Sequence, residues 1–191
     1  MPELSITPIN YQNEDALHHI PQGSGRNIFL FLGANIGNYN AHQAILFGRK
    51  IAHSMTGQDF LMVGFDLKKD PQTILNAYND SQGFTRNFNL NLLTRINREL
   101  GGNFDLTAFT HYPTYNPQTG SCQSYLVSRK QQEVLIDNHP IQFEEHECIH
   151  MEISQKYTVE QTDALANATS FLPLHYYYDS KRWFLDVIWQ C

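Results

Sequence analysis

The chain has 191 residues, 41% of them hydrophobic, which is enough to bury the core of one ordinary domain. Its 13 Lys plus Arg against 19 Asp plus Glu give a net charge of −6, which argues against binding to a nucleic-acid backbone. Three cysteines without CxxC spacing, and no apolar run of the roughly 20 residues that span a bilayer, predict a cytoplasmic protein with no membrane partner.

The first half of the chain predicts a strand, a helix and a second strand. The unbroken apolar run 28–32 is typical of a strand that is buried on both faces of a parallel sheet, and it ends at a turn with Gly33. Asn40 can cap a helix over 41–55, and 60–65 supplies the second buried strand. This order predicts a strand-helix-strand unit.

Two helices are predicted next. Asp70 followed by proline is an N-cap with proline at the first helical position, which opens a helix that runs to about Asn79. A longer helix is predicted from apolar residues at every fourth position, namely Phe84, Phe88, Leu92, Ile96 and Leu100. The pair Gly101-Gly102 ends it.

From about residue 111 the pattern changes to short β-like stretches separated by turn residues, which include 124–128 and 132–136. Thr158 and Gln161 then form a capping box for a helix to about Ala168. The stretches 174–178 and 183–189 predict a closing hairpin. The middle stretches are therefore interpreted as an antiparallel insertion.

Together these elements predict an α/β fold: a partial, Rossmann-like sheet of the kind found in methyltransferases, with an inserted antiparallel β unit. We expect three parts. Residues 1–110 form the partial core, 111–157 form a β-rich substrate-recognition unit, and 158–191 complete the core with a helix and a hairpin.

His146-Glu147-Cys148-Ile149-His150 satisfies the HExxH signature of zinc hydrolases, in which a helix directs both histidines to the metal. The surrounding apolar residues, however, alternate with the period of two that is typical of a strand. On a strand, His146 and His150 lie about 13 Å apart. We therefore expect no metal here, and a zinc hydrolase is kept as the third functional hypothesis.

Several short strings, in order along the chain, carry a resemblance to a known family. They are FLFLGANIGN (29–38), DLKKD (66–70), NAYND (76–80), FNLNLL (88–93), INRELGGNFD (96–105) and the Glu-x-Ser-x-Lys-Tyr string at 152–157. The sequence resembles the histidine-specific methyltransferases that depend on S-adenosylmethionine (SAM), the L-histidine Nα-methyltransferases of ergothioneine biosynthesis. The resemblance runs from about residue 28 to residue 191.

The resemblance implies methyl transfer from SAM to the α-amino nitrogen of histidine or a related amino acid. It implies that four residues bind the substrate: Asn38, Tyr78, Glu152 and Ser154. Asn38 is assigned to the amino-acid end, Tyr78 to the carboxylate, and Glu152 with Ser154 to the imidazole nitrogens. Two residues apart, Glu152 and Ser154 share one face of a strand, which permits this role.

The same resemblance assigns Gly33, Asn10 and Tyr11 to SAM. Family members have a glycine-rich loop ahead of the segments matched here, and we expect this SAM-binding half to be absent from the chain. The residues that deprotonate the amine stay unassigned.

Loss of parallel strands leaves a sheet edge unpaired, so we expect a homo-oligomer or a separate covering chain. The leading hypothesis is a methyltransferase that needs such a partner for its activity. The second hypothesis is a non-catalytic module that still binds an amino acid or a protein. We expect the turn after Leu32 and the strand of Glu152 to meet across a shared cleft.

Overall fold

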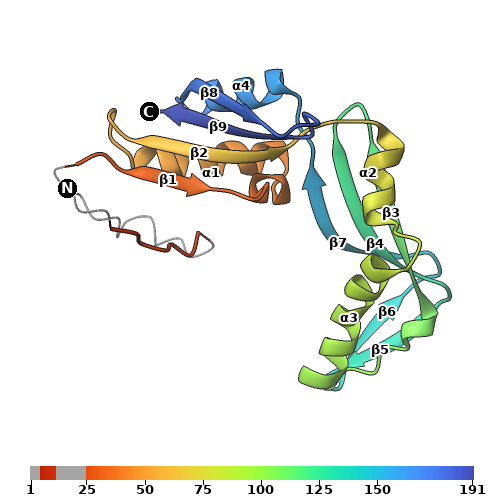
Figure 1. Cartoon of the computed structure of the whole chain (residues 1–191). Coiled ribbons are helices and arrows are strands. Elements are labelled where there is room, and N and C mark those ends of the chain that lie inside the picture. Colours follow the sequence, from red (N-terminus) through yellow and green to blue (C-terminus); the bar gives the residue numbers. More distant parts are fainter. Residues whose placement is uncertain (1–4, 12–24) are drawn as a thin grey trace. The chain divides into compact units, whose positions relative to one another are not determined.

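The computed structural model describes residues 5–11 and 25–191, and it divides the chain into two compact units. The first unit comprises Met1–Phe65 with Thr158–Cys191, and the second comprises Asp66–Tyr157. In Figure 1 the second unit is the part coloured from yellow through green and cyan to the blue of β7, at Cys148–Gln155. No helix in the described residues is long and apolar enough to cross a membrane.

The first unit is built on one four-stranded sheet, in the order β1-β2-β9-β8. The strands β1 (Ile28–Phe31) and β2 (Phe60–Asp66) are parallel, whereas β8 (Leu172–Tyr178) and β9 (Phe184–Gln190) form an antiparallel pair. This confirms the predicted α/β sheet with its closing hairpin. The connection from β1 to β2 contains the 3₁₀ turn η2 (Asn35–Asn38) and the helix α1 (Ala41–His53); α4 (Val159–Ala168) precedes β8.

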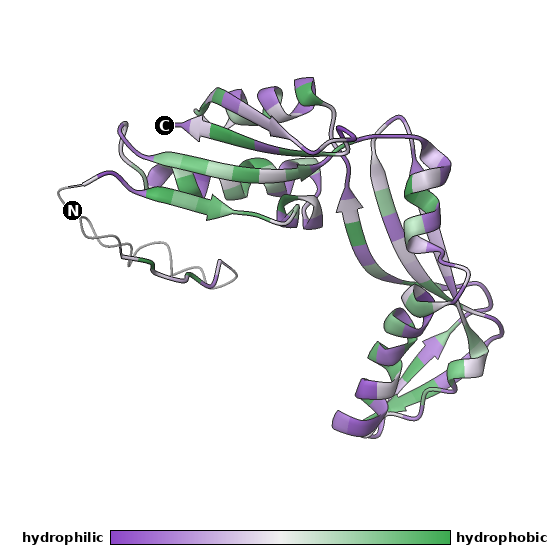
Figure 2. Cartoon of the chain, viewed as in Figure 1, coloured by the Kyte–Doolittle hydropathy of each residue, from purple (hydrophilic) through white to green (hydrophobic). Residues whose placement is uncertain are grey.

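The core of the first unit lies along β2 and β9, whose side chains are mostly apolar in Figure 2. Trp189 is 2% exposed and its ring lies 5.7 Å from that of Phe65 and 5.6 Å from that of Phe171. The predicted N-cap Asn40 and the predicted capping box of Thr158 and Gln161 are both present, and Asn40 also forms a capping box: Asn40 accepts from the Gln43 backbone amide, and Thr158 accepts from the Gln161 backbone amide.

Asp59 ties the starts of β1 and β2 together. It is 1% exposed, and its two carboxylate oxygens accept hydrogen bonds of 2.8 Å from the backbone amides of Asn27 and Thr56. Burial raises the pKa of Asp59, but these bonds favour the ionised form more strongly, so the net pKa is lowered. The ionised carboxylate is therefore part of the fold.

We expect Asp59→Asn to lower the free energy of unfolding at pH 7 by about 1 to 3 kcal/mol, as for a buried, charge-assisted hydrogen bond. Because the pKa is lower in the folded state, this stabilisation is complete above the unfolded value of about 3.9 and disappears as the pH falls through the folded value. Urea unfolding at pH 7 and at pH 3 measures it. Asp137→Asn, at an exposed turn, should leave stability unchanged at both pH values.

The second unit contains two sheets and two helices. A three-stranded antiparallel sheet has the order β3-β4-β7, with β3 at Phe109–Asn116, β4 at Ser121–Ser128 and β7 at Cys148–Gln155. A two-stranded sheet pairs β5 (Gln132–Ile136) with β6 (His139–Phe143). The helices are α2 (Pro71–Tyr78) and α3 (Phe84–Glu99), and the 3₁₀ turn η3 (Leu106–Ala108) precedes β3.

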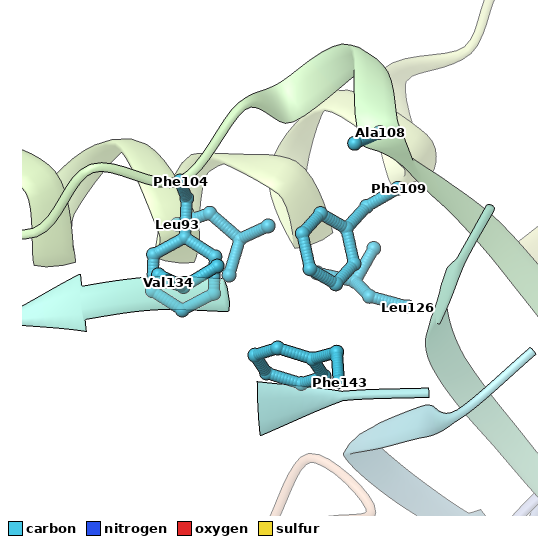
Figure 3. Packing of buried hydrophobic residues seen from close by; sticks show 7 residues of the cluster. All are labelled: Leu93, Phe104, Ala108, Phe109, Leu126, Val134 and Phe143. Carbon is cyan, nitrogen blue, oxygen red and sulfur yellow. The ribbon is translucent and has the colours of Figure 1, made fainter. Parts of the chain in front are cut away.

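The second unit is larger than the predicted β-rich part 111–157, because α2 and α3 both pack against β3 and β4. Its core is a cluster of buried apolar side chains that point toward one another (Figure 3): Leu93, Phe104, Ala108, Phe109, Leu126, Val134 and Phe143. The helix from Phe84 is confirmed, but its every-fourth-residue stripe does not form the core. Phe84 and Phe88 are 68% and 72% exposed, and Leu93 with Asn89 is buried instead.

Candidate functional site

The strand β7 places Glu152 and Ser154 on one face of the three-stranded sheet. Glu152 pairs with Ser124 of β4, and Ser154 pairs with Cys122. Because directly opposite residues of antiparallel strands share a face, these four side chains lie together. The register shifts between Ser124 and Tyr125, so the strand is irregular immediately beyond Glu152.

Two polar groups on this face lack hydrogen-bond partners within the described part of the chain. The Ser124 hydroxyl is fully buried and unpartnered. The half-buried Glu152 carboxylate makes no hydrogen bond or ion pair with a described residue. Since buried polar groups in proteins are normally satisfied, this face has hydrogen-bonding capacity for a polar ligand.

Lys156 joins the site residues of β7 and α2. Its side chain is 3% exposed, and its ammonium donates to the Tyr78 hydroxyl at 2.9 Å and the Ser154 hydroxyl at 2.8 Å. It also forms an ion pair of 2.7 Å with Asp66, whose other carboxylate oxygen binds Lys69 at 2.6 Å. Tyr78 and Ser154, far apart in sequence, are thus brought together around one cation.

The ammonium of Lys156 is held in its charged form. Burial lowers the pKa of Lys156, but the hydrogen bonds with Asp66 and Tyr78 outweigh this effect, so the pKa is raised overall. The neighbouring Cys122 thiol has its pKa raised to about 11, mainly by burial, and stays protonated. The site therefore contains a fixed cation but no reactive thiolate.

A cavity of about 220 Å³ opens beside the same sheet face, between the loop that joins α2 to α3 and His111 of β3. Asp80 in this loop accepts from the Phe84 and Thr85 amides, and these bonds lower its pKa to about 2. Burial lowers the pKa of His111, which favours a neutral ring. The lining also includes Arg86, so the cavity is polar and suits a small, polar ligand.

The turn after β1 carries the residues that were assigned to the other end of the substrate and to SAM. Gly33 has a φ of +77° and is exposed, and the exposed Asn38 is the last residue of η2. A Cβ atom on Gly64 of β2 would lie 3.2 Å from the Gly33 amide nitrogen and 3.0 Å from a carboxylate oxygen of Asp186. Gly64 therefore permits a close approach of β2, β9 and this turn.

Asn10 and Tyr11 also belong to the first unit. Asn10 is exposed, and the Tyr11 ring lies edge-on at 5.2 Å from Phe31 and 5.9 Å from Phe47. Tyr39 stacks on the same Phe47 ring at 5.1 Å. An aromatic cluster thus forms at β1 and α1, which suits contact with a flat ring.

The HExxH string does not form the helix that zinc hydrolases require. His146 lies in an exposed turn with a φ of +70°, and β7 begins at Cys148 and includes His150. Within the described residues, no group of three His, Cys, Asp or Glu side chains is placed to hold a metal ion. The prediction that this segment forms a strand is confirmed for residues 148–155.

Three residues of this neighbourhood were not identified from the sequence: Lys156, Asp66 and Ser124. A signal for Lys156 was present, since it belongs to the Glu-x-Ser-x-Lys-Tyr string at 152–157 that carries the family resemblance, but no role was assigned to it. No sequence signal marked Asp66 or Ser124 as a site residue, because single polar residues are common at strand ends and within β strands. Their significance arises only from their contacts.

The sequence matches the family described as "Histidine-specific methyltransferase, SAM-dependent" over residues 1–191. The chain belongs to this family. The chain is 35% identical to a histidine N-alpha-methyltransferase of Mycobacterium tuberculosis over 153 residues, which cover 79% of this chain and 47% of that protein. It is 31% identical to the enzyme of the same name from Mycolicibacterium smegmatis over 180 residues, 93% of this chain and 56% of that one.

A further relative of the chain is ergothioneine biosynthesis protein 1 of Schizosaccharomyces pombe, which is 29% identical over 134 residues. The match covers 70% of this chain and 17% of that protein. The chain thus spans about half the length of the two mycobacterial relatives it matches. Family membership confirms the resemblance that was seen in the sequence motifs.

Proposed function

We propose that the chain provides the histidine-binding part of a SAM-dependent Nα-methyltransferase. The observation that carries this proposal is the cluster around Lys156, which joins Tyr78 of α2 to Ser154 of β7 on the face that also bears Glu152. These are three of the four residues that the family resemblance assigns to histidine. The fourth, Asn38, lies in the exposed turn of the first unit.

Each group suits one part of the amino acid. The Tyr78 hydroxyl donates to the α-carboxylate, Ser154 and Glu152 hydrogen-bond the imidazole, and the Asn38 amide donates to or accepts from the amino-acid end. Transfer of a methyl group to nitrogen is a displacement that depends on position: a neutral amine must be held in line with the carbon, about 3 to 3.5 Å away. The protein groups therefore act by holding and orienting the substrate.

SAM, when bound, supplies the electrophilic methyl carbon. Gly33, with a positive φ and an exposed backbone, and Tyr11, in an aromatic cluster, fit the edge of such a cofactor, and we propose that they contact it together with Asn10.

We propose that another polypeptide completes the cofactor site by continuing the sheet at β1. The support is that β1 is an edge strand of the described sheet and that two of its side chains, Ile28 and Leu30, are 66% and 63% exposed. An apolar edge of this kind favours pairing with further strands. Analytical sedimentation of the purified chain distinguishes the two possible partners. If the partner is a second copy, the purified chain sediments as an oligomer; if the partner is a different chain, the purified chain sediments as a monomer.

The binding of histidine to the purified chain tests the proposal. We expect isothermal titration calorimetry to detect histidine binding, and Glu152→Gln to weaken it tenfold or more, because a charge-assisted hydrogen bond contributes about 1.5 to 3 kcal/mol. Glu144→Gln is the matched control, since Glu144 is an exposed residue of the same unit. Equal affinities of both variants, or no binding by the unmodified chain, would contradict the proposal.

The second candidate function is a module that binds an amino acid without catalysis. The same titration with SAM, followed by mass spectrometry of the mixture, distinguishes the two functions. Methylated histidine, with or without a second chain present, supports the transferase. Binding of histidine alone, with no methylated product in any combination, supports the module.

A further inference from the structure

The Lys156 ammonium has three N–H donors, and three acceptors take them up. They are the Tyr78 hydroxyl at 2.9 Å, the Ser154 hydroxyl at 2.8 Å and an Asp66 carboxylate oxygen at 2.7 Å. No donor is left for a ligand. Lys156 therefore acts on a substrate only through the two hydroxyl groups that it contacts.

A hydroxyl that accepts a hydrogen bond from an ammonium still has its own proton to give. An ammonium cannot accept, so the direction of both bonds is fixed: the oxygens of Tyr78 and Ser154 must be the acceptors. Their hydroxyl protons point away from Lys156 and are available to a neighbouring acceptor. Each oxygen keeps one lone pair, but its hydrogen bond from a cation polarises the hydroxyl, which makes it a stronger donor and a weaker acceptor.

Glu152 supplies the opposite polarity. Its carboxylate is two residues from Ser154 on the same strand face and makes no hydrogen bond within the described residues. A donor from Ser154 and an acceptor from Glu152 match the two nitrogens of a neutral imidazole, of which one accepts and the other donates. An imidazolium ring has two donors, so Ser154 would have to accept through its remaining lone pair, which the hydrogen bond from the Lys156 cation disfavours.

Resting on the proposed function, we propose that Lys156 is a positioning residue that makes Ser154 a hydrogen-bond donor, so that the site binds the imidazole of histidine in its neutral form. The charges around the site do not by themselves require a neutral imidazole, because the Glu152 carboxylate would favour the charged ring. The groups that face Lys156 are Asp66 with Lys69, Tyr78, Tyr115, Cys122 and Glu152. His111 is the further titratable group near Glu152.

The direct test is ¹⁵N NMR of labelled histidine bound to the unmodified chain at pH 6, where most free histidine is imidazolium. We expect two different ring-nitrogen shifts, of one protonated and one unprotonated nitrogen. Two protonated nitrogens in the bound ring would overturn the proposal. This measurement needs no variant, and a complete absence of binding would instead count against the proposed function.

Lys156→Met tests the lysine itself, and the fold should tolerate it because Lys69 still neutralises Asp66. Once the lysine is gone, Ser154 is no longer polarised by a cation and accepts more readily, and we expect the bound ring to become at least half imidazolium at pH 6. We also expect the preference for histidine over thienylalanine, which lacks ring nitrogens, to fall fivefold or more. An unchanged protonation state and an unchanged preference would contradict the role of Lys156.

Two variants separate positioning from a merely structural role. If Lys156 acts through Ser154, then Lys156→Met should cost no additional preference for histidine in a chain that already carries Ser154→Ala. Lys156→Arg, which keeps a cation with several donors, should retain the preference within threefold, and it replaces the methionine variant if that variant does not fold. Additive losses in the double variant would overturn the proposal.

Discussion

Gly120→Ala is expected to destabilise the second unit by about 3 to 5 kcal/mol, the sum of left-handed strain and overpacking. Gly120 has a φ of +81°, and a Cβ atom there would lie 2.2 Å from the Lys156 carbonyl oxygen and 2.5 Å from Cε of Lys68. Its carbonyl also accepts from the Lys156 amide at 2.8 Å. The substitution therefore displaces the backbone that positions Lys156, and histidine binding should be lost with it.

Gly101→Ala is the matched control for this prediction. Gly101 also has a positive φ, +62°, but a Cβ atom there would meet nothing within 4 Å. We expect it to cost only about 1 to 2 kcal/mol, from strain alone, and to leave histidine binding intact. Chemical unfolding followed by far-ultraviolet circular dichroism measures both variants. Equal losses in the two variants would show that contact with Lys156 is not the cause.

Phe109→Ala should also cost about 3 to 5 kcal/mol, as is typical of a phenylalanine removed from a packed core. The Phe109 side chain is 2% exposed, and its ring lies 5.7 Å from that of Phe104 and 5.4 Å from that of Phe143 (Figure 3). The cavity that remains would lie where α3, β3 and β6 meet, so we expect the second unit to unfold at a lower denaturant concentration.

Phe88→Ala provides the comparison, since Phe88 is 72% exposed on α3 and its loss should change stability by no more than about 0.5 kcal/mol. Hydrogen exchange of β3 and β4 amides, which lie in the same unit, should accelerate in the Phe109 variant and not in the Phe88 variant. A large cost for Phe88→Ala would indicate that another surface covers this side of α3 in solution.

The sequence alone determined most of the local structure, because local signals are strong where the chain itself provides both partners. Asn40 and Thr158 cap helices through residues three positions further on, and the apolar run 28–32 contains the strand β1. The prediction that this strand is buried on both faces is wrong, because Ile28 and Leu30 at the sheet edge are 66% and 63% exposed. The ordered motifs likewise identified the methyltransferase family. The roles of Glu152, Ser154 and Tyr78 in binding the substrate stay predictions from the same motifs.

Only the tertiary structure decided which groups meet. The every-fourth-residue stripe from Phe84 is a correct helix signal, but the helix buries its Leu93 side instead, because that side contacts the sheet. Nothing near Lys156 in the sequence indicates Asp66 or Tyr78 as its partners, since they lie on other elements, 90 and 78 residues away. A hydrogen bond between distant segments depends on the path of the whole chain, which local residue patterns do not encode.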